Sequence, residues 1–115
     1  MKLPQVEQAI IPQRKLTEYL LSPTHRSGRS KAAFFVGFGF AVEAWETLAD
    51  ALRRHAAEHD VVATDETPFG TGYTVEGALL APDGRTPRVR VVWFIETGEV
   101  VPRLVTAYPL KEAKT

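Results

Sequence analysis

The sequence predicts an α+β fold in which three N-terminal helices precede a four-stranded antiparallel sheet. Apolar residues recur at helical spacing over residues 12–59, whereas residues 60–109 alternate with the period of two that strands require. Glycine and proline turn signals separate the alternating segments. Because the helical and strand patterns occupy separate parts of the chain, the sequence favours α+β over a parallel α/β sheet.

The composition is that of one soluble globular domain over residues 1–115. The chain is 44% hydrophobic and 24% charged, and 115 residues suffice for a single core but not for two. The absence of cysteine excludes disulfides, thiolate catalysis and cysteine-ligated zinc. No apolar run approaches the roughly 20 residues of a membrane span, and the N-terminus lacks the apolar region of a signal peptide. We therefore expect a cytoplasmic protein without a membrane partner.

The first predicted helix follows a short lead-in. Residues 1–11 are expected to be extended, because Pro4 and Pro12 interrupt regular structure. The helix is expected from Pro12 to about Leu21, where the residue before Pro23 disfavours helical geometry. Its apolar stripe has the spacing i, i+3, i+4 and consists of Leu16, Tyr19 and Leu20.

Two further helices are predicted before residue 60. The second runs from Ala32 through Val36 and ends at Gly37 and Gly39. It is apolar nearly all round, so we expect it to be buried. The third extends over residues 43–58 and has one apolar stripe, made of Trp45, Leu48, Ala49, Leu52 and Ala56.

Four strands are expected over residues 60–109, at 61–66, 72–81, 87–97 and 103–108. The turn Pro82-Asp83-Gly84 joins the second strand to the third, so the strands follow one another as a meander. Residues 110–115 are expected to form a frayed tail.

Zero net charge conceals an uneven distribution of charge. Residues 1–31, 32–83 and 84–115 carry net charges of +4, −7 and +3. If folding brings the two ends together, they form a positive surface suited to an anionic partner. Three solvated faces of mixed sign are the alternative.

The first candidate site is the basic loop before the second helix. His25 can give and take a proton near neutral pH, and Arg26, Arg29 and Lys31 can hold a phosphate. Ser30 is positioned to cap the following helix, whose amides also attract anions. The alternative is a solvent-exposed connector.

The third strand provides a second basic patch. Alternation places Arg88 and Arg90 on the face opposite the apolar set Val89, Val91, Trp93 and Ile95. On the last strand, Thr106 and Tyr108 would add a hydroxyl donor and a stacking surface if they share that open face. The pattern of the last strand does not decide which residues face outward.

The sequence HAAEH, from His55 to His59, matches the H-x-x-E-H pattern of inverted zinc peptidases. We reject zinc because the helix ends at His59, no third ligand is marked, and the chain is too short for a peptidase cleft. Cationic histidines at a helix C-terminus explain the pattern more simply.

The segment from Lys2 to Pro109 resembles a bacterial family catalogued as a domain of unknown function, number 6883. The resemblance is carried by H-x-x-G-x-x-K-A-x-F-F, which begins at His25, and by the runs VWFIETG and LVTAYP in the last two strands. Such domains occur as small proteins and at the ends of polymorphic toxins, a setting that resembles the barnase–EndoU–colicin–RelE group of ribonuclease toxins.

This resemblance implies a toxin with metal-independent endoribonuclease activity, no cofactor, an RNA substrate and a cognate antitoxin or immunity protein. His25 would act as general acid or base, and Lys31 with Arg29 or Arg90 would stabilise the phosphorane. Further contacts would come from Thr106, which would donate to phosphate, from Tyr108, which would stack on a base, and from Arg88. No second histidine lies near His25 in sequence, so its acid–base partner is expected from the sheet. The alternative is a non-catalytic binding module of the antitoxin or immunity type that uses the same face.

Overall fold

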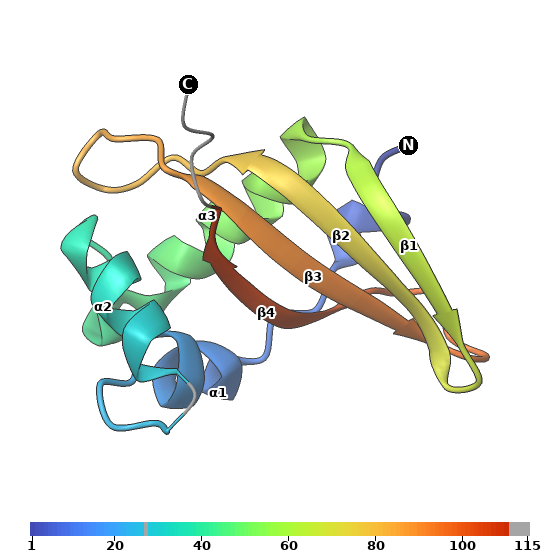
Figure 1. The fold of residues 1–115 in the computed structure, drawn as a ribbon, viewed down its shortest axis with the longest axis horizontal. Helices are drawn as coiled ribbons and strands as arrows, with labels where there is room; N and C mark the ends of the chain where they lie inside the picture. The colour runs from blue at the N-terminus through green and yellow to red at the C-terminus, as the bar shows by residue number, and fades with distance from the viewer. Residues whose placement is uncertain (27, 111–115) are drawn as a thin grey trace.

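A computed structural model describes residues 1–26 and 28–110 and confirms the α+β class, with the helices preceding the sheet (Figure 1). The helical part contains a 3-10 turn η1 (Val6–Gln8), α1 (Gln13–Lys15), a π-helical turn η2 (Leu16–Leu20), α2 (Arg29–Gly37), a 3-10 turn η3 (Val42–Ala44) and α3 (Trp45–Glu58). The strands are β1 (Val61–Thr67), β2 (Gly70–Ala78), β3 (Arg88–Glu96) and β4 (Arg103–Pro109). The predicted tail, apart from Leu110, lies outside the described residues.

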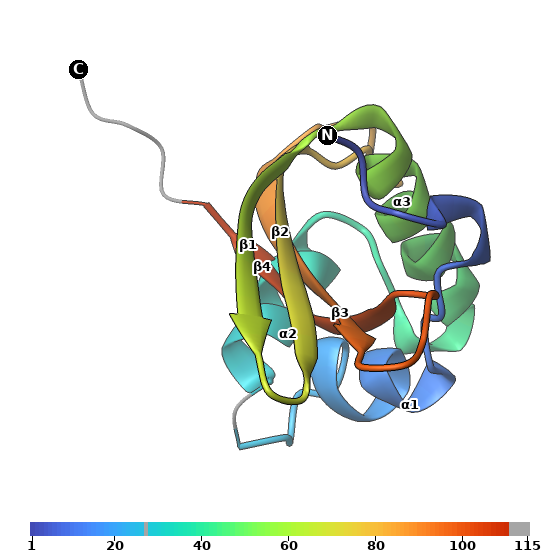
Figure 2. The same cartoon turned by 90° about the vertical axis from the view of Figure 1, so that its right-hand side faces the viewer.

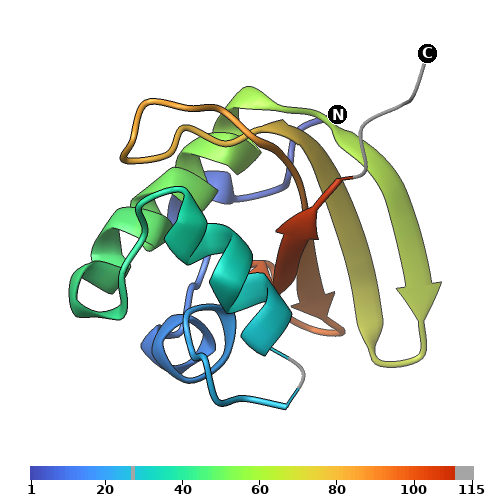
Figure 3. The same ribbon diagram turned by 60° about the vertical axis from the view of Figure 1, so that its left-hand side comes forward.

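The strands form one antiparallel meander in the order β1-β2-β3-β4, as the turn signals predict. Helix α3 lies against one face of this sheet, as Figures 1 and 2 show from two directions. The segment α1–η2 and helix α2 lie side by side next to the edge strand β4 (Figure 3). The other face of the sheet has no helix over it among the described residues.

The covered face of the sheet supplies the centre of the hydrophobic core. Val89, Val91 and Trp93 are fully buried, as their alternation on β3 predicts. They belong to one apolar cluster with Leu48 and Leu52 of α3. Each large apolar side chain buried in this way stabilises the fold by about 1.5–3 kcal/mol.

A β-bulge at Val105 decides which residues of β4 face outward. Trp93 pairs with Leu104, but the preceding Val92 pairs with Thr106, so Val105 has no partner across the ladder. The bulge reverses the alternation at this point. Leu104 and Ala107 therefore both lie in the core, while Thr106 and Tyr108 share the open face with Val92 and Arg90.

The N-terminal segment is not simply extended, as the sequence suggests. It contains η1 and then joins β4 through a parallel bridge between Ile10 and Arg103. The guanidinium of Arg53 on α3 donates to the carbonyl of Ala9 at 3.3 Å. Because Leu3, Ala9 and Ile11 are buried, this segment is held by the core, which local sequence patterns do not reveal.

Helix α2 differs from its prediction in two respects. It begins at Arg29, so Gly28 occupies the N-cap position and Ser30, expected to cap the helix, lies inside the first turn. It is also buried on one side only, because Ala33 and Val36 are exposed whereas Ala32 and Phe35 are buried. The tertiary fold covers only the side that faces the core.

Helix α3 has the predicted apolar stripe, but the prediction of a cationic histidine at its C-terminus is wrong for His55. His55 is buried, and burial together with the nearby charge of His59 lowers its pKa to about 4. The rings of His55 and His59 contact the carbonyls of Gly77 and Ala78 at 3.2 and 2.9 Å. A Cβ on Gly77 would lie 2.5 Å from the His59 ring, so only glycine permits this contact. The pair therefore joins α3 to β2.

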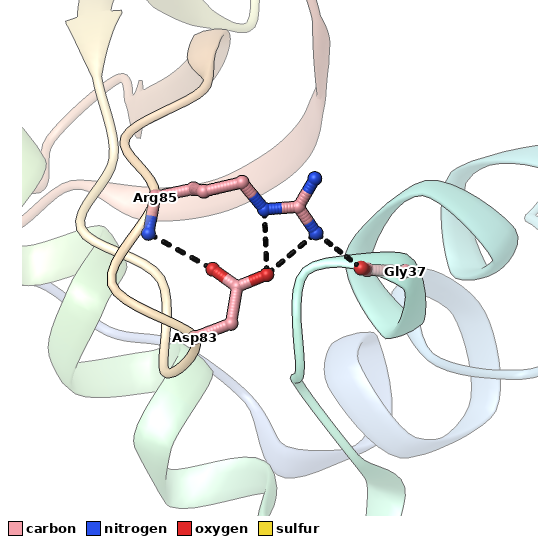
Figure 4. A network of polar contacts seen from close by, with 3 residues as sticks. All are labelled: Gly37, Asp83 and Arg85. Carbon is pink, nitrogen blue, oxygen red and sulfur yellow. Dashed lines mark hydrogen bonds and ion pairs between the residues drawn. The ribbon is translucent and has the colours of Figure 1, made fainter.

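The connection from β2 to β3 is fixed to the end of α2. Arg85 donates to Asp83 through Nε at 2.7 Å and to the carbonyl of Gly37 at 2.8 Å (Figure 4). The guanidinium also lies 4.2 Å from the centre of the Phe38 ring. These contacts hold the loop and α2 together.

No single helix in the described part of the chain is long and apolar enough to cross a membrane. Helix α2 and the segment Val42–Glu58 together have the length and apolar composition of a membrane-spanning segment, but a bend of 76° separates them.

Candidate functional site

Tyr19 lies at the centre of a cluster of polar groups at the edge of the open face. Its hydroxyl and Oγ1 of Thr106 are hydrogen-bonded at 3.1 Å, joining η2 to β4. The sequence pattern assigns Tyr19 to an apolar helical stripe with Leu16 and Leu20, and those two leucines are indeed fully buried. Tyr19 itself is half-buried, because its ring packs on the core while its hydroxyl reaches the sheet edge.

The basic loop packs directly on Tyr19. A Cβ on Gly28 would lie 2.2 Å from the carbonyl oxygen of Tyr19 and 2.9 Å from its ring carbon Cδ1. Only glycine permits this approach, which brings the start of α2 against η2. The loop is therefore anchored at Gly28, although residues 23–26, His25 among them, are solvent-exposed, as the alternative expected.

Two lysines lie over the ring of Tyr19. Nζ of Lys15 is 5.4 Å and Nζ of Lys31 is 5.5 Å from the ring centre. Partial burial raises the pKa of Tyr19, but hydrogen bonds with Thr106 and Lys31 and the charges of both lysines lower the pKa below its ordinary value. The surroundings thus favour the phenolate more than water does.

His25 contacts the same tyrosine. The two rings meet edge to face, with their centres 5.0 Å apart. Nδ1 of His25 accepts a hydrogen bond from the amide of Gly28 at 3.0 Å. This bond assigns the neutral tautomer in which Nε2 carries the proton, because an N–H donor needs a lone pair on Nδ1.

A second group of polar residues lies next to this cluster on the open face. Nε of Arg90 donates to Glu76 at 2.5 Å, and its Nη1 donates to the hydroxyl of Tyr108 at 3.3 Å. Arg90 and Tyr108 are partners across β3 and β4, and Tyr108 is two residues from Thr106 on the same face. That separation is about 7 Å along a strand.

The structure separates two of the predicted site residues from the cluster. Arg29 and Lys31 are two residues apart on α2, so their side chains point about 200° apart around the helix. Arg29 lines an apolar groove of about 560 Å³ with Pro23, Val36 and Val42. Arg88 is exposed on β3 and lines a different groove, beside Phe34 and Phe38.

A pocket of about 410 Å³ opens beside Tyr19 and is lined by Pro12, Arg14, Lys15, Glu18, Tyr19 and His25. Arg14 and Glu18 form an ion pair at 3.0 Å on its rim. The sequence does not identify Lys15 and Tyr19 as site residues. Both lie in a helix whose periodicity distinguishes buried from exposed positions but carries no signal of a functional site. Within residues 1–26 and 28–110, no group of three His, Asp or Glu side chains is arranged to hold a metal.

The fold and the cluster define a small α+β domain with a basic, tyrosine-centred site at the edge of its sheet. The chain belongs to the family described as "Domain of unknown function (DUF6883)", whose model matches residues 2–111. No curated protein matches it. Its fold is similar to that of a chain in the contact-dependent growth inhibition toxin–immunity protein complex from Klebsiella pneumoniae 342. That likeness has a TM-score of 0.71 and 14% identity, and covers 93% of this chain and 97% of the other.

Proposed function

We propose that this domain is the toxin of a bacterial toxin–immunity or toxin–antitoxin system and acts as a metal-independent endoribonuclease. The observation that carries the proposal is the convergence of Tyr19, His25, Lys31 and Thr106 around one hydrogen bond between η2 and β4. These groups come from three elements, η2, α2 and β4, and from the loop before α2, and they combine positive charge, hydroxyls and an aromatic surface. This is the chemistry needed to hold an RNA phosphate and a base.

The proposed reaction begins when the ribose 2′-oxygen attacks the adjacent phosphorus. The bond from phosphorus to the 5′-oxygen then breaks, leaving a 2′,3′-cyclic phosphate. Lys31 would stabilise negative charge on the phosphorane, and Thr106 would donate to a phosphate oxygen. Arg90 and Tyr108 lie beside Thr106 on the same face of the sheet. Arg90 would contact a neighbouring phosphate, and Tyr108 would contact a neighbouring base.

The proposal includes the partner and the place of action. The likeness to a chain of a toxin–immunity protein complex supports a cognate immunity or antitoxin protein that covers the open face. An RNA substrate implies action in the cytoplasm. The basic cluster would be the part of the surface that an acidic partner neutralises.

The test compares wild-type protein with Lys31→Gln in an RNA cleavage assay in the presence of EDTA. We expect cleavage by the wild type with products that end in a cyclic phosphate, and a loss of 100-fold or more in the variant, on the order expected for removing one charge-stabilising group. Lys2→Gln is the matched control, because Lys2 pairs with Asp60 away from the site. If the wild type cleaves no RNA and is harmless when expressed in cells, the nuclease proposal fails.

A non-catalytic immunity-type module is the second candidate, and the edge strand β1 favours it. Six of the seven residues of β1 are exposed, and the strand carries Asp65 and Glu66. An exposed edge of this kind can pair with a strand of a basic partner. Stoichiometric binding to the product of a neighbouring toxin gene, lost on Asp65→Lys and without RNA cleavage, would support this candidate.

A further inference from the structure

We infer that Tyr19, and not His25, is the group that takes the proton from the ribose 2′-hydroxyl, with Lys31 as the acid that protonates the departing 5′-oxygen. This inference rests on the proposed ribonuclease function and assigns its proton transfers. The sequence places the acid–base partner of His25 on the sheet. The aromatic ring that His25 contacts in the structure is instead Tyr19, from the first helical segment.

The hydrogen bond from Gly28 indicates which nitrogen of the neutral His25 ring carries the proton. Its Nδ1 lone pair accepts the Gly28 amide at 3.0 Å, so Nε2 of the neutral ring already carries a proton. In this tautomer the Nε2–H of His25 is a hydrogen-bond donor suited to a phosphate oxygen, so the geometry assigns His25 to substrate binding.

The surroundings of Tyr19 suit a base. The phenol oxygen is hydrogen-bonded to Thr106, and Nζ of Lys15 and of Lys31 lie 5.4 and 5.5 Å from the centre of the ring. The other charged groups near the pocket, Arg14 and Glu18, are paired with each other. The positive charge that faces the phenol oxygen therefore comes from the two lysines, and it lowers the cost of forming the phenolate.

The proton transfers balance within the pair. The phenolate of Tyr19 takes the 2′-hydroxyl proton as the bond from the 2′-oxygen to phosphorus forms. The ammonium of Lys31 gives a proton to the 5′-oxygen as its bond to phosphorus breaks. The phenol of Tyr19 then returns its proton to the amine of Lys31, whose Nζ lies 5.5 Å from the centre of the tyrosine ring. Both residues end in their starting states, and no further reactant is needed.

The position of Tyr19 supports this assignment. It lies in a π-helical turn, a local distortion that is frequent at functional sites. Gly28 closes directly on its main chain, which fixes the ring relative to His25 and α2. A core tyrosine would need neither the glycine contact nor the two lysines.

The test is the pH dependence of RNA cleavage by the wild type, Tyr19→Phe, His25→Gln and the control Tyr73→Phe. Tyr73 lies on β2 and lines a separate groove. We expect kcat/KM of the wild type to rise tenfold per pH unit below the pKa of Tyr19. The kcat/KM of Tyr19→Phe should be lower than that of the wild type by about 100-fold or more, and it should no longer rise with pH. Tyr73→Phe should match the wild type, and His25→Gln, which keeps an N–H donor, should retain the pH profile.

A second measurement needs no RNA. The difference in phenolate absorbance between the wild type and Tyr19→Phe during a pH titration gives the pKa of Tyr19, which we expect below its ordinary value and raised by Lys31→Met. If RNA is cleaved and Tyr19→Phe keeps its activity, or if His25→Gln abolishes the pH profile, the inference is wrong and the proposed function stands. If the wild type cleaves no RNA, both are wrong.

Discussion

Gly28 lies so close to Tyr19 that a Cβ on the glycine would be 2.2 Å from the tyrosine carbonyl oxygen. This contact places the basic loop on the helical segment that carries Tyr19. The arrangement of His25, Lys31 and Thr106 around the phenol follows from it, since the same glycine donates to His25.

Gly28→Ala is expected to destabilise the protein by about 1–3 kcal/mol, because the added methyl group overlaps backbone atoms and cannot be accommodated by a side-chain rotation. Urea unfolding measures the change. Gly37→Ala is the matched control. A Cβ there meets nothing within 4 Å, so this substitution should leave stability unchanged or slightly increased. Equal effects of the two variants would contradict the close approach at Gly28.

Thr106→Val should lower stability by about 0.5–1.5 kcal/mol, because it removes the hydroxyl that bonds Tyr19 without changing the side-chain shape. A double-mutant cycle with Tyr19→Phe isolates the interaction, and the two losses should not add. Thr74→Val, in the same cross-strand row, serves as control. Additive losses would mean that the two hydroxyls do not interact.

His55 should make the unfolding free energy depend on pH. Burial lowers its pKa from 6.5 to about 4, so the unfolded chain binds the proton more strongly than the folded one. The stability that this group contributes is therefore complete above pH 6.5 and is lost as pH falls toward 4. The loss reaches about 3 kcal/mol.

Denaturant unfolding of the wild type and of His55→Gln at several pH values between 4 and 7 checks this. We expect a shallower pH slope in His55→Gln than in the wild type. Carboxylates contribute to both slopes equally, so the difference reports His55. Should His55→Gln fail to fold, the histidine C2–H chemical shift of the wild type gives the same pKa by NMR, and a value near 6.5 would contradict burial of the neutral ring.

Arg90→Gln is expected to weaken RNA binding and reduce the slope of log K against log salt by about one, because one phosphate contact is lost. Stability should change little, since the pair with Glu76 is partly solvent-exposed. Glu76→Gln should strengthen binding by removing a competing carboxylate. Arg54→Gln, whose partner Glu58 lies on the same helix, is the control. An unchanged salt slope would remove Arg90 from the interface.

The sequence predicts the elements whose patterns are regular. The stripe of α3 and the alternation of β3 contain residues that the core buries, but Ile95, which the alternation assigns to the core, is only partly buried. The helix–sheet order also follows, because each pattern is continuous over its own part of the chain.

The site is less accessible from the sequence, because its key relationships are not local. The bulge at Val105 depends on pairing with β3, so the outward direction of Thr106 and Tyr108 could not be read from β4 alone. The partnership of Tyr19 with Thr106 spans 87 residues. Arg29 looks equivalent to Lys31 by composition, yet helical geometry turns it to another groove. In the sequence, Gly28 indicates only a turn. Its contact with Tyr19 depends on the packing of η2 against α2, which the sequence pattern does not reveal.

The separation of 87 positions between Tyr19 and Thr106 also imposes an order on synthesis. The ribosome releases the first helices long before the final strand, so the tyrosine, the histidine and the lysine emerge without the threonine that joins them to the sheet. A nascent or prematurely terminated chain that ends before β4 thus carries most of the functional groups but cannot assemble them. Completion of translation therefore becomes a condition for the site to exist.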